Sequence, residues 1–179
     1  MSGLLKLALL MDKISERVSK LAAWAVFLSA MICAFNAFIR YGLDWSSNSL
    51  LEIQWYLFAW VVMVGAPFVL KANEHVRVDL IYGKVKGHGQ VYIDLFGLIF
   101  FLLPVMGYLA WLTFPYFKTT FISGEMSQNA GGLIRWPVTL SLPVGFAMVF
   151  LQGLSELVKR IAYLQGKHTM DTHYEAPLQ

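Results

Sequence analysis

Charged side chains are scarce in this chain of 179 residues: Asp, Glu, Lys and Arg make up 14% of it, whereas a soluble domain carries about a quarter. The charges are also clustered, so four runs of 18 to 23 residues contain none: 21–39, 53–70, 95–117 and 136–155. A helix needs about 20 apolar residues to cross the hydrocarbon core of a bilayer. The shortage of charge therefore argues against a soluble globular domain and predicts four transmembrane helices.

The sequence also lacks the residues that most enzymes and cofactor sites need. No polar segment is long enough for an independent catalytic domain, and the single cysteine, Cys33, can form no internal disulfide. All four histidines lie outside the uncharged runs, which argues against axial haem ligands within the membrane. The chain shows no Ser/His/Asp set, phosphate-binding glycine loop or cysteine cluster. We therefore expect no enzyme activity, no bound metal and no cofactor.

The basic residues are distributed unevenly among the segments that connect the expected spans. Eleven lie in the N-terminal segment, the loop after the second span and the C-terminal segment, and three lie in the other two loops. Lys159 and Arg160 are counted with the C-terminal segment. The positive-inside rule then places both termini in the cytoplasm. Because the basic residues flank apolar runs and form no continuous patch, nucleic-acid binding is not expected.

The expected fold is an all-α integral membrane protein with a single four-helix domain at 1–165 and a polar cytoplasmic tail at 166–179. The spans are expected at about 21–39, 50–70, 92–117 and 136–157. Residues 4–20 predict an amphipathic helix without a cleaved signal. Its apolar residues recur at spacings of three and four: Leu4, Leu7, Met11, Ile14, Val18 and Leu21. We expect this helix to lie in the membrane interface; packing on a partner subunit and simple extension of the first span are the alternatives.

Polar residues near the span ends are the candidate structural sites. They include Asn36, Arg40 and Tyr41 at the end of the first span, and Glu52, Trp55 and Trp60 early in the second. A carboxylate at the depth of Glu52 needs a compensating cation. We expect it to pair with Arg40, the closest arginine in sequence, or with an arginine of a partner.

Two further segments contain candidate residues. Glu74, His75, Arg77 and Asp79 form the densest polar cluster of the chain, and composition alone favours a solvated loop there. In the last span, Pro137 fits a first-turn position, whereas Pro143, beside Gly145, should bend the helix.

Four short patterns occur in order along the chain. They are Asn36, Arg40 and Tyr41 (N-x-x-x-R-Y); Glu52 followed by Trp55, Tyr56, Leu57 and Trp60; Glu74-His75-Val76-Arg77-Val78-Asp79 (E-H-[VI]-R-V-D); and Gly124, Glu125 and Ser127 (G-E-x-S) leading to Pro137, Pro143 and Gly145. Together they resemble the small membrane subunit, the Q component (DctQ-like), of tripartite ATP-independent periplasmic (TRAP) transporters. One departure is the Gly-rich stretch Asn129-Ala130-Gly131-Gly132-Leu133, which leaves the contacts of that loop open.

The resemblance implies a non-catalytic scaffold subunit in the bacterial inner membrane. It implies a large multi-span M component that carries the substrate and sodium sites in an elevator-type transporter. It also implies a periplasmic binding protein that delivers an organic acid anion. The 74–79 cluster would then be a structural staple at the cytoplasmic interface, in which Arg77 and Asp79 pair with each other or with Glu74.

Two other classes of protein remain as alternatives. A small anchor or assembly subunit of a respiratory complex would need ligand-like residues or a quinone-sized polar pocket, and the sequence indicates neither. A four-span lipid-modifying enzyme would need paired carboxylates or histidines within or just above the spans. The scaffold subunit is therefore the leading hypothesis.

Overall fold

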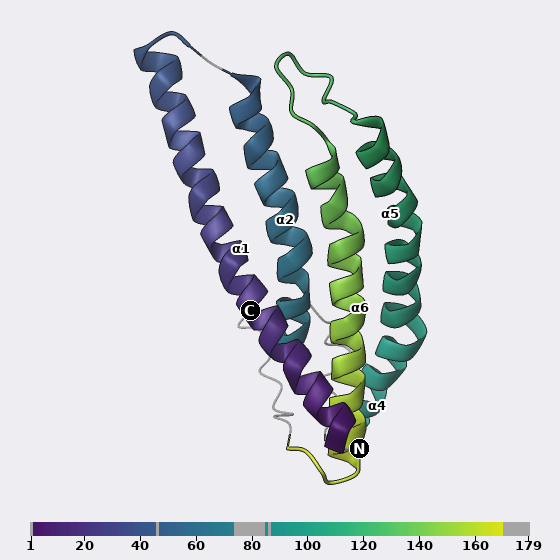
Figure 1. The fold of residues 1–179 in the computed structure, drawn as a ribbon. Coiled ribbons are helices and arrows are strands. Elements are labelled where there is room, and N and C mark those ends of the chain that lie inside the picture. The colour runs from purple at the N-terminus through teal and green to yellow at the C-terminus, as the bar shows by residue number, and fades with distance from the viewer. Residues whose placement is uncertain (1, 46, 74–84, 86, 170–179) are drawn as a thin grey trace.

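The computed structural model describes residues 2–45, 47–73, 85 and 87–169 (Figure 1). The elements are α1 (Ser2–Gly42), α2 (Asn48–Ala72), α4 (His88–Gly97), the π-helical turn η1 (Leu98–Leu102), α5 (Leu103–Ser123) and α6 (Trp136–Leu164). Because α4, η1 and α5 run on without a break, the described residues contain four helices long and apolar enough to cross a membrane. The predicted all-α membrane fold with four spans is confirmed.

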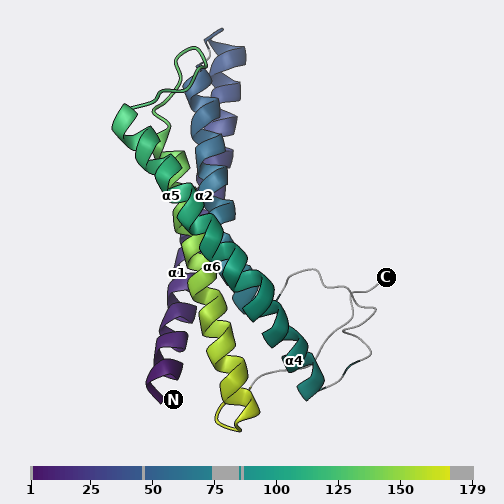
Figure 2. The same cartoon turned by 90° about the vertical axis from the view of Figure 1, so that its right-hand side faces the viewer.

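Helix α6 is the centre of the arrangement. It packs against α1, α2 and α5, and α1 packs along α2 (Figure 1). In its most apolar stretch 39% of the residues are buried, against 6% to 17% in the other three spans. Figure 2 shows α5 crossing α6 obliquely. The start of α1 and the end of α6 lie at one end of the molecule, and the α5–α6 loop lies at the other (Figure 1).

The segment predicted as a separate amphipathic helix is continuous with the first span. Helix α1 runs unbroken from Ser2 to Gly42, so residues 4–20 extend that span. Their apolar stripe faces away from the other helices: Leu4, Leu7 and Leu21 are each more than half exposed, whereas Asp12 and Ser15 are buried. The position of this segment relative to a membrane surface stays a prediction.

Local sequence explains where several helices begin and end. The Ser47 side chain caps the start of α2 by accepting a hydrogen bond from Ser49 N–H at 3.3 Å. Asn73 ends α2, and Gly124 ends α5; both are in the left-handed conformation, which Asn and Gly adopt most readily. Pro137 lies in the first turn of α6, where its missing N–H has no helical partner to lose.

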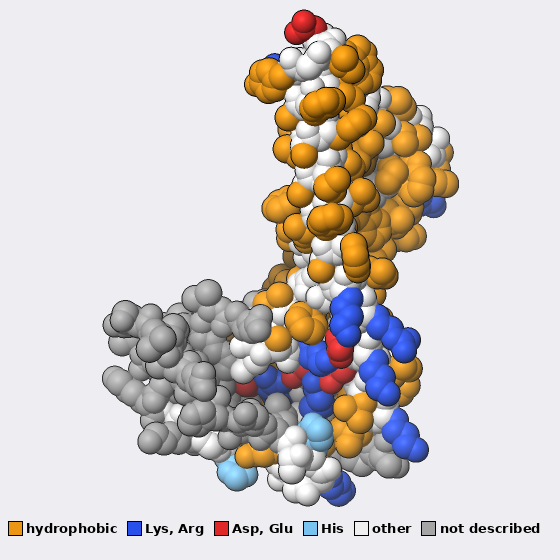
Figure 3. Space-filling view, turned by 90° about the vertical axis from the view of Figure 1, so that its left-hand side faces the viewer, with side chains coloured by type: hydrophobic (Ala, Val, Ile, Leu, Met, Phe, Trp, Pro, Cys, Tyr) orange, Lys and Arg blue, Asp and Glu red, His pale blue; other side chains and the backbone are white. Residues whose placement is uncertain are grey.

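Large apolar side chains lie mostly outside the bundle, and small or polar ones lie inside. The largest completely buried side chains are Ser15, Pro67, Thr120, Ser141 and Gln152, whereas Trp24, Phe38, Phe58 and Trp111 are each at least two-thirds exposed. Figure 3 shows hydrophobic side chains over most of the α1 side, with Lys and Arg gathered toward one end. Lipid is as apolar as leucine, so membrane helices associate through small residues and polar contacts.

Candidate functional site

The first polar cluster, which we call the loop cluster, joins the start of α2 to the α5–α6 loop. It consists of Glu52, Ser127, Asn129 and the backbone of Leu133. Glu52 is only 2% exposed. Its carboxylate accepts hydrogen bonds from Asn129 Nδ2 at 2.7 Å, from Leu133 N–H at 2.7 Å and from the Ser127 hydroxyl. Donors from one loop therefore stabilise a buried carboxylate that lies about 80 residues earlier in the chain.

The α5–α6 loop folds back on itself to present these donors. Met126 and Ile134 form an isolated antiparallel bridge, and Ser127 N–H donates to Leu133 O at 2.8 Å. Gly131 has φ +70°, and a Cβ at Gly132 would lie 2.6 Å from Ser127 Cβ and 2.9 Å from a backbone oxygen. The Gly-rich stretch, whose contacts the sequence left open, is thus required for the close turn over Glu52.

Arg135 closes the same loop. Its guanidinium forms an ion pair with Glu125 and donates to the Tyr116 hydroxyl at 3.2 Å. Its backbone N–H donates to Glu125 O at 2.9 Å. The residue therefore connects the loop to α5, and it lies close enough to Glu52 for electrostatic attraction.

The expected pair between Glu52 and Arg40 is wrong. Glu52 takes its partners from the loop, and Arg40 is exposed at the end of α1 without an ion pair among the described residues. Tyr41 is also exposed. Asn36, by contrast, is 7% exposed, and its Oδ1 has no hydrogen-bond partner in the described part of the chain. The three residues of the N-x-x-x-R-Y pattern thus have different surroundings.

Other candidate residues tie α2 to α6. Trp60 Nε1–H donates to Pro137 O at 2.9 Å, whereas Trp55 is 63% exposed. A Cβ at Gly145 would lie 2.6 Å from Met63 Cβ, so glycine there allows the two helices to approach closely. Pro143 is buried inside the continuous helix α6.

A second polar cluster, which we call the three-helix cluster, lies at the other end of the bundle. It contains Asp12 and Ser15 of α1, Asp94 of α4, and Gln152, Ser155, Glu156, Lys159 and Arg160 of α6. Lys159 Nζ binds both Asp12 oxygens, at 2.9 and 3.1 Å, and also pairs with Glu156. Arg160 pairs with Glu156 and binds Asp94 Oδ2 at 3.1 Å. The cluster therefore connects three helices through charges of both signs.

Neutral polar groups complete the three-helix cluster. Gln152 donates to Asp12 Oδ1 at 2.8 Å and accepts from Ser15 Oγ at 2.7 Å. Ser155 Oγ donates to Ala8 O at 2.9 Å. Glu156, Lys159 and Arg160 are 3%, 8% and 5% exposed. Charges this deeply buried are tolerated only when they are paired and hydrogen-bonded.

Sequence reasoning missed this cluster. It assigned Lys159 and Arg160 to the tail as topology signals, and it predicted no partner within the chain for the polar face of residues 4–20. The signal was present in the spacing of α6, where Glu156, Lys159 and Arg160 lie three and four residues apart and so share a face. Asp12 and Ser15 similarly share the polar face of α1. Glu74, His75, Arg77 and Asp79 lie outside the described residues.

The observed geometry defines a class of protein: a multi-pass membrane protein whose buried polar groups fasten its helices to one another. The family described as "Tripartite ATP-independent periplasmic transporters, DctQ component" matches residues 29–162. The chain belongs to this family. This membership and the four long apolar helices favour a multi-pass protein of the bacterial inner membrane over the respiratory anchor and the lipid-modifying enzyme.

Two curated relatives are named as small permease proteins of TRAP transporters. A C4-dicarboxylate TRAP transporter small permease protein of Pseudomonas aeruginosa is 31% identical over 117 residues, which are 63% of this chain and 53% of the relative. A TRAP transporter small permease protein of Haemophilus influenzae is 30% identical over 91 residues, 49% of this chain and 55% of the relative. The matches thus span about half the length of these relatives. No solved structure matches the chain.

Proposed function

We propose that the chain is the non-catalytic scaffold subunit of a sodium-driven TRAP transporter. In this proposal it braces the static part of a large elevator-type M component. A periplasmic binding protein delivers an organic acid anion to that component. Membership of the DctQ family supports a place in a TRAP transporter, whereas the sodium gradient and the bracing role are inferences.

The bracing role is inferred from the partners of the buried charged groups. In the three-helix cluster, Lys159 and Arg160 of α6 bind carboxylates of α1 and α4, while Glu156 joins the two cations within α6. In the loop cluster, Glu52 of α2 is bound by the α5–α6 loop. Charges that serve an ion path line a cavity or a polar channel, whereas these charges fix the helices against each other. A rigid bundle with an apolar exterior suits a subunit that supports a moving neighbour.

The proposed orientation places both termini in the cytoplasm. The distribution of basic residues predicts it, and the start of α1 and the end of α6 lie at the same end of the molecule (Figure 1), as an even number of spans requires. The loop cluster would then face the periplasm. The 74–79 cluster of the sequence, which lies outside the described residues, is proposed as a staple or subunit contact on the cytoplasmic side.

The substrate is proposed to be an organic acid anion. The Pseudomonas aeruginosa relative is named for C4-dicarboxylates, so these are the first compounds to assay. Because substrate specificity is proposed to lie in the other two components, substitutions in this chain should change the transport rate without changing the order of preferred substrates.

Reconstitution into proteoliposomes tests the proposal. Uptake of a labelled dicarboxylate should require this chain, the large subunit, the binding protein and an inward sodium gradient. The control replaces sodium by potassium at equal ionic strength. Uptake at full rate by the large subunit and the binding protein alone would show that no brace is required.

A further inference from the structure

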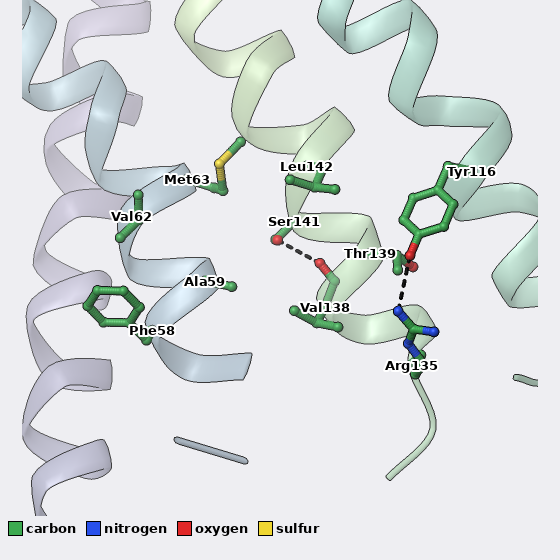
Figure 4. Close-up of a pocket in the computed structure, with 10 residues that line it drawn as sticks. All are labelled: Phe58, Ala59, Val62, Met63, Tyr116, Arg135, Val138, Thr139, Ser141 and Leu142. Atoms are coloured by element: carbon green, nitrogen blue, oxygen red, sulfur yellow. Dashed lines mark hydrogen bonds between the residues drawn. The ribbon is translucent and has the colours of Figure 1, made fainter. Parts of the chain in front are cut away.

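An apolar groove lies between α2 and α6 near the loop cluster. Its volume is about 350 Å³, which is the size of a small-ligand pocket. Ala59, Val62 and Met63 of α2 line one side, and Val138 and Leu142 of α6 line the other (Figure 4). The groove lies along helices that are apolar and long enough to span the bilayer. Its surroundings are therefore lipid chains or other protein, not water.

The hydroxyl groups in the wall are already used. Thr139 Oγ1 donates to Trp136 O at 3.1 Å, and Ser141 Oγ donates to Val138 O at 2.6 Å. Figure 4 shows the second of these bonds within α6. The wall therefore presents carbon atoms almost alone, and a water molecule there would find too few polar partners. The suitable occupant is a hydrocarbon chain.

One end of the groove is charged. Arg135 and Tyr116 meet there, joined by their hydrogen bond of 3.2 Å (Figure 4), and Arg135 also pairs with Glu125. These two contacts use one N–H on each terminal nitrogen of a guanidinium that carries five N–H donors, so donors remain for a further acceptor. The Arg135 and Glu125 side chains are 36% and 40% exposed. A cation and an anion are thus accessible side by side above an apolar groove.

We propose that this groove is a phospholipid site. One acyl chain fills the space between α2 and α6, and Arg135 binds the phosphate. Glu125 binds a primary ammonium of the headgroup, which identifies the ligand as a phosphatidylethanolamine. Charge complementarity supports this choice: a zwitterionic headgroup satisfies both members of the Arg135–Glu125 pair, whereas an anionic headgroup places its charge beside the carboxylate as well.

The direct test locates the bound lipid. The full-length chain is reconstituted in vesicles with a phosphatidylethanolamine that carries a photoreactive diazirine on one acyl chain, and the cross-linked peptides are identified by mass spectrometry. Cross-links should concentrate on groove residues such as Val62 and Leu142, about tenfold above exposed α1 residues such as Phe27. An even distribution over all exposed helices would overturn the proposal. So would cross-linking of a photoreactive residue at Val62 to another protein chain in native membranes.

Matched variants separate the acyl-chain contact from headgroup recognition. Ala59→Phe fills the groove and should lower cross-linking about tenfold, whereas Ala23→Phe on the exposed face of α1 should leave it unchanged. Arg135→Gln should weaken retention of the lipid in native mass spectrometry, and Arg40→Gln, at an exposed arginine, should not.

Headgroup choice gives an independent readout if Arg135→Gln disturbs the loop. Glu125→Gln should abolish the preference for phosphatidylethanolamine over phosphatidylglycerol while acyl-chain cross-linking in the groove continues. An unchanged preference would overturn the assignment of Glu125. Equal retention of both lipids by the unaltered chain would likewise overturn the assignment of the headgroup.

Discussion

The two polar clusters stabilise buried carboxylates in different ways. In the loop cluster, Glu52 is bound by a hydroxyl, an amide and a backbone N–H, all from one loop. In the three-helix cluster, carboxylates are bound mainly by Lys159 and Arg160, and the partners come from three helices. The first arrangement fixes a loop on a helix end, and the second fixes helices on one another. Losing a charge from the second should therefore affect the whole bundle.

The largest effect is expected for Lys159→Met. It leaves Asp12 without its cation in a buried site, and breaking a buried ion pair in this way costs about 3–5 kcal/mol. The measurement is unfolding of the purified chain in detergent. Lys20→Met is the control, because Lys20 is 73% exposed and pairs with Glu16, which is 44% exposed; its unfolding midpoint should not change. Equal losses in both variants would contradict the importance of burial.

A double variant tests whether the loss in Lys159→Met comes from the unpaired carboxylate of Asp12. Combining Lys159→Met with Asp12→Leu removes both partners, and apolar replacement of a whole buried pair is often close to neutral. The double variant should recover most of the stability lost by Lys159→Met alone. Failure to recover would mean that the cluster acts through its hydrogen bonds to Gln152 and Ser155 rather than through the ion pair.

Two glycine-to-alanine substitutions, one at Gly132 beside the loop cluster and one at Gly153 next to Gln152, compare how well each site accommodates an added Cβ. An alanine Cβ at Gly132 would meet a backbone oxygen at 2.9 Å, whereas one at Gly153 meets the end of the Leu102 side chain at 2.6 Å. Leu102 can rotate, and alanine favours a helix over glycine by about 0.5–1 kcal/mol. Gly132→Ala should therefore cost about 1–3 kcal/mol, and Gly153→Ala should be nearly neutral. The reverse order in thermal unfolding would contradict this difference.

The loop cluster itself is tested by Glu52→Gln. The amide nitrogen of glutamine would face a donor where a carboxylate oxygen now accepts from Asn129 or Leu133. The α5–α6 loop should detach more often, and limited proteolysis within it should become about tenfold faster. Arg40→Gln serves as the control and should leave cleavage unchanged. If both variants behaved alike, the loop would not be the main partner of Glu52.

Part of this fold could be predicted from the sequence, and part could not. The four spans followed from uncharged runs, because the cost of charge in hydrocarbon is large. The face of α1 that meets α6 did not follow, because residues 4–20 were expected to lie in the membrane interface on their apolar stripe, and no partner was predicted for their polar face. Next to lipid, such a stripe can remain exposed while Asp12 and Ser15 turn inward.

The partners of Glu52 could not be predicted from closeness in the sequence either. Arg40 is twelve positions away, whereas Asn129 and Leu133 are 77 and 81 positions away. All three described donors to Glu52 are uncharged, so a search for a complementary charge could not find them. Only the turn formed by Gly131 and Gly132 brings them to the carboxylate.

The smallest effect is expected for Trp60→Phe, which tests a neutral bond near the loop cluster. The variant keeps an aromatic ring but removes the hydrogen bond from Nε1 to Pro137 O. Polar contacts between membrane helices contribute about 0.6 kcal/mol on average, so the loss of stability should be of that size. Trp55→Phe is the control on the same helix, since Trp55 is 63% exposed. A loss several times larger for Trp60→Phe would mean that the α2–α6 contact, and not the two ionic clusters, dominates the rigidity of the bundle.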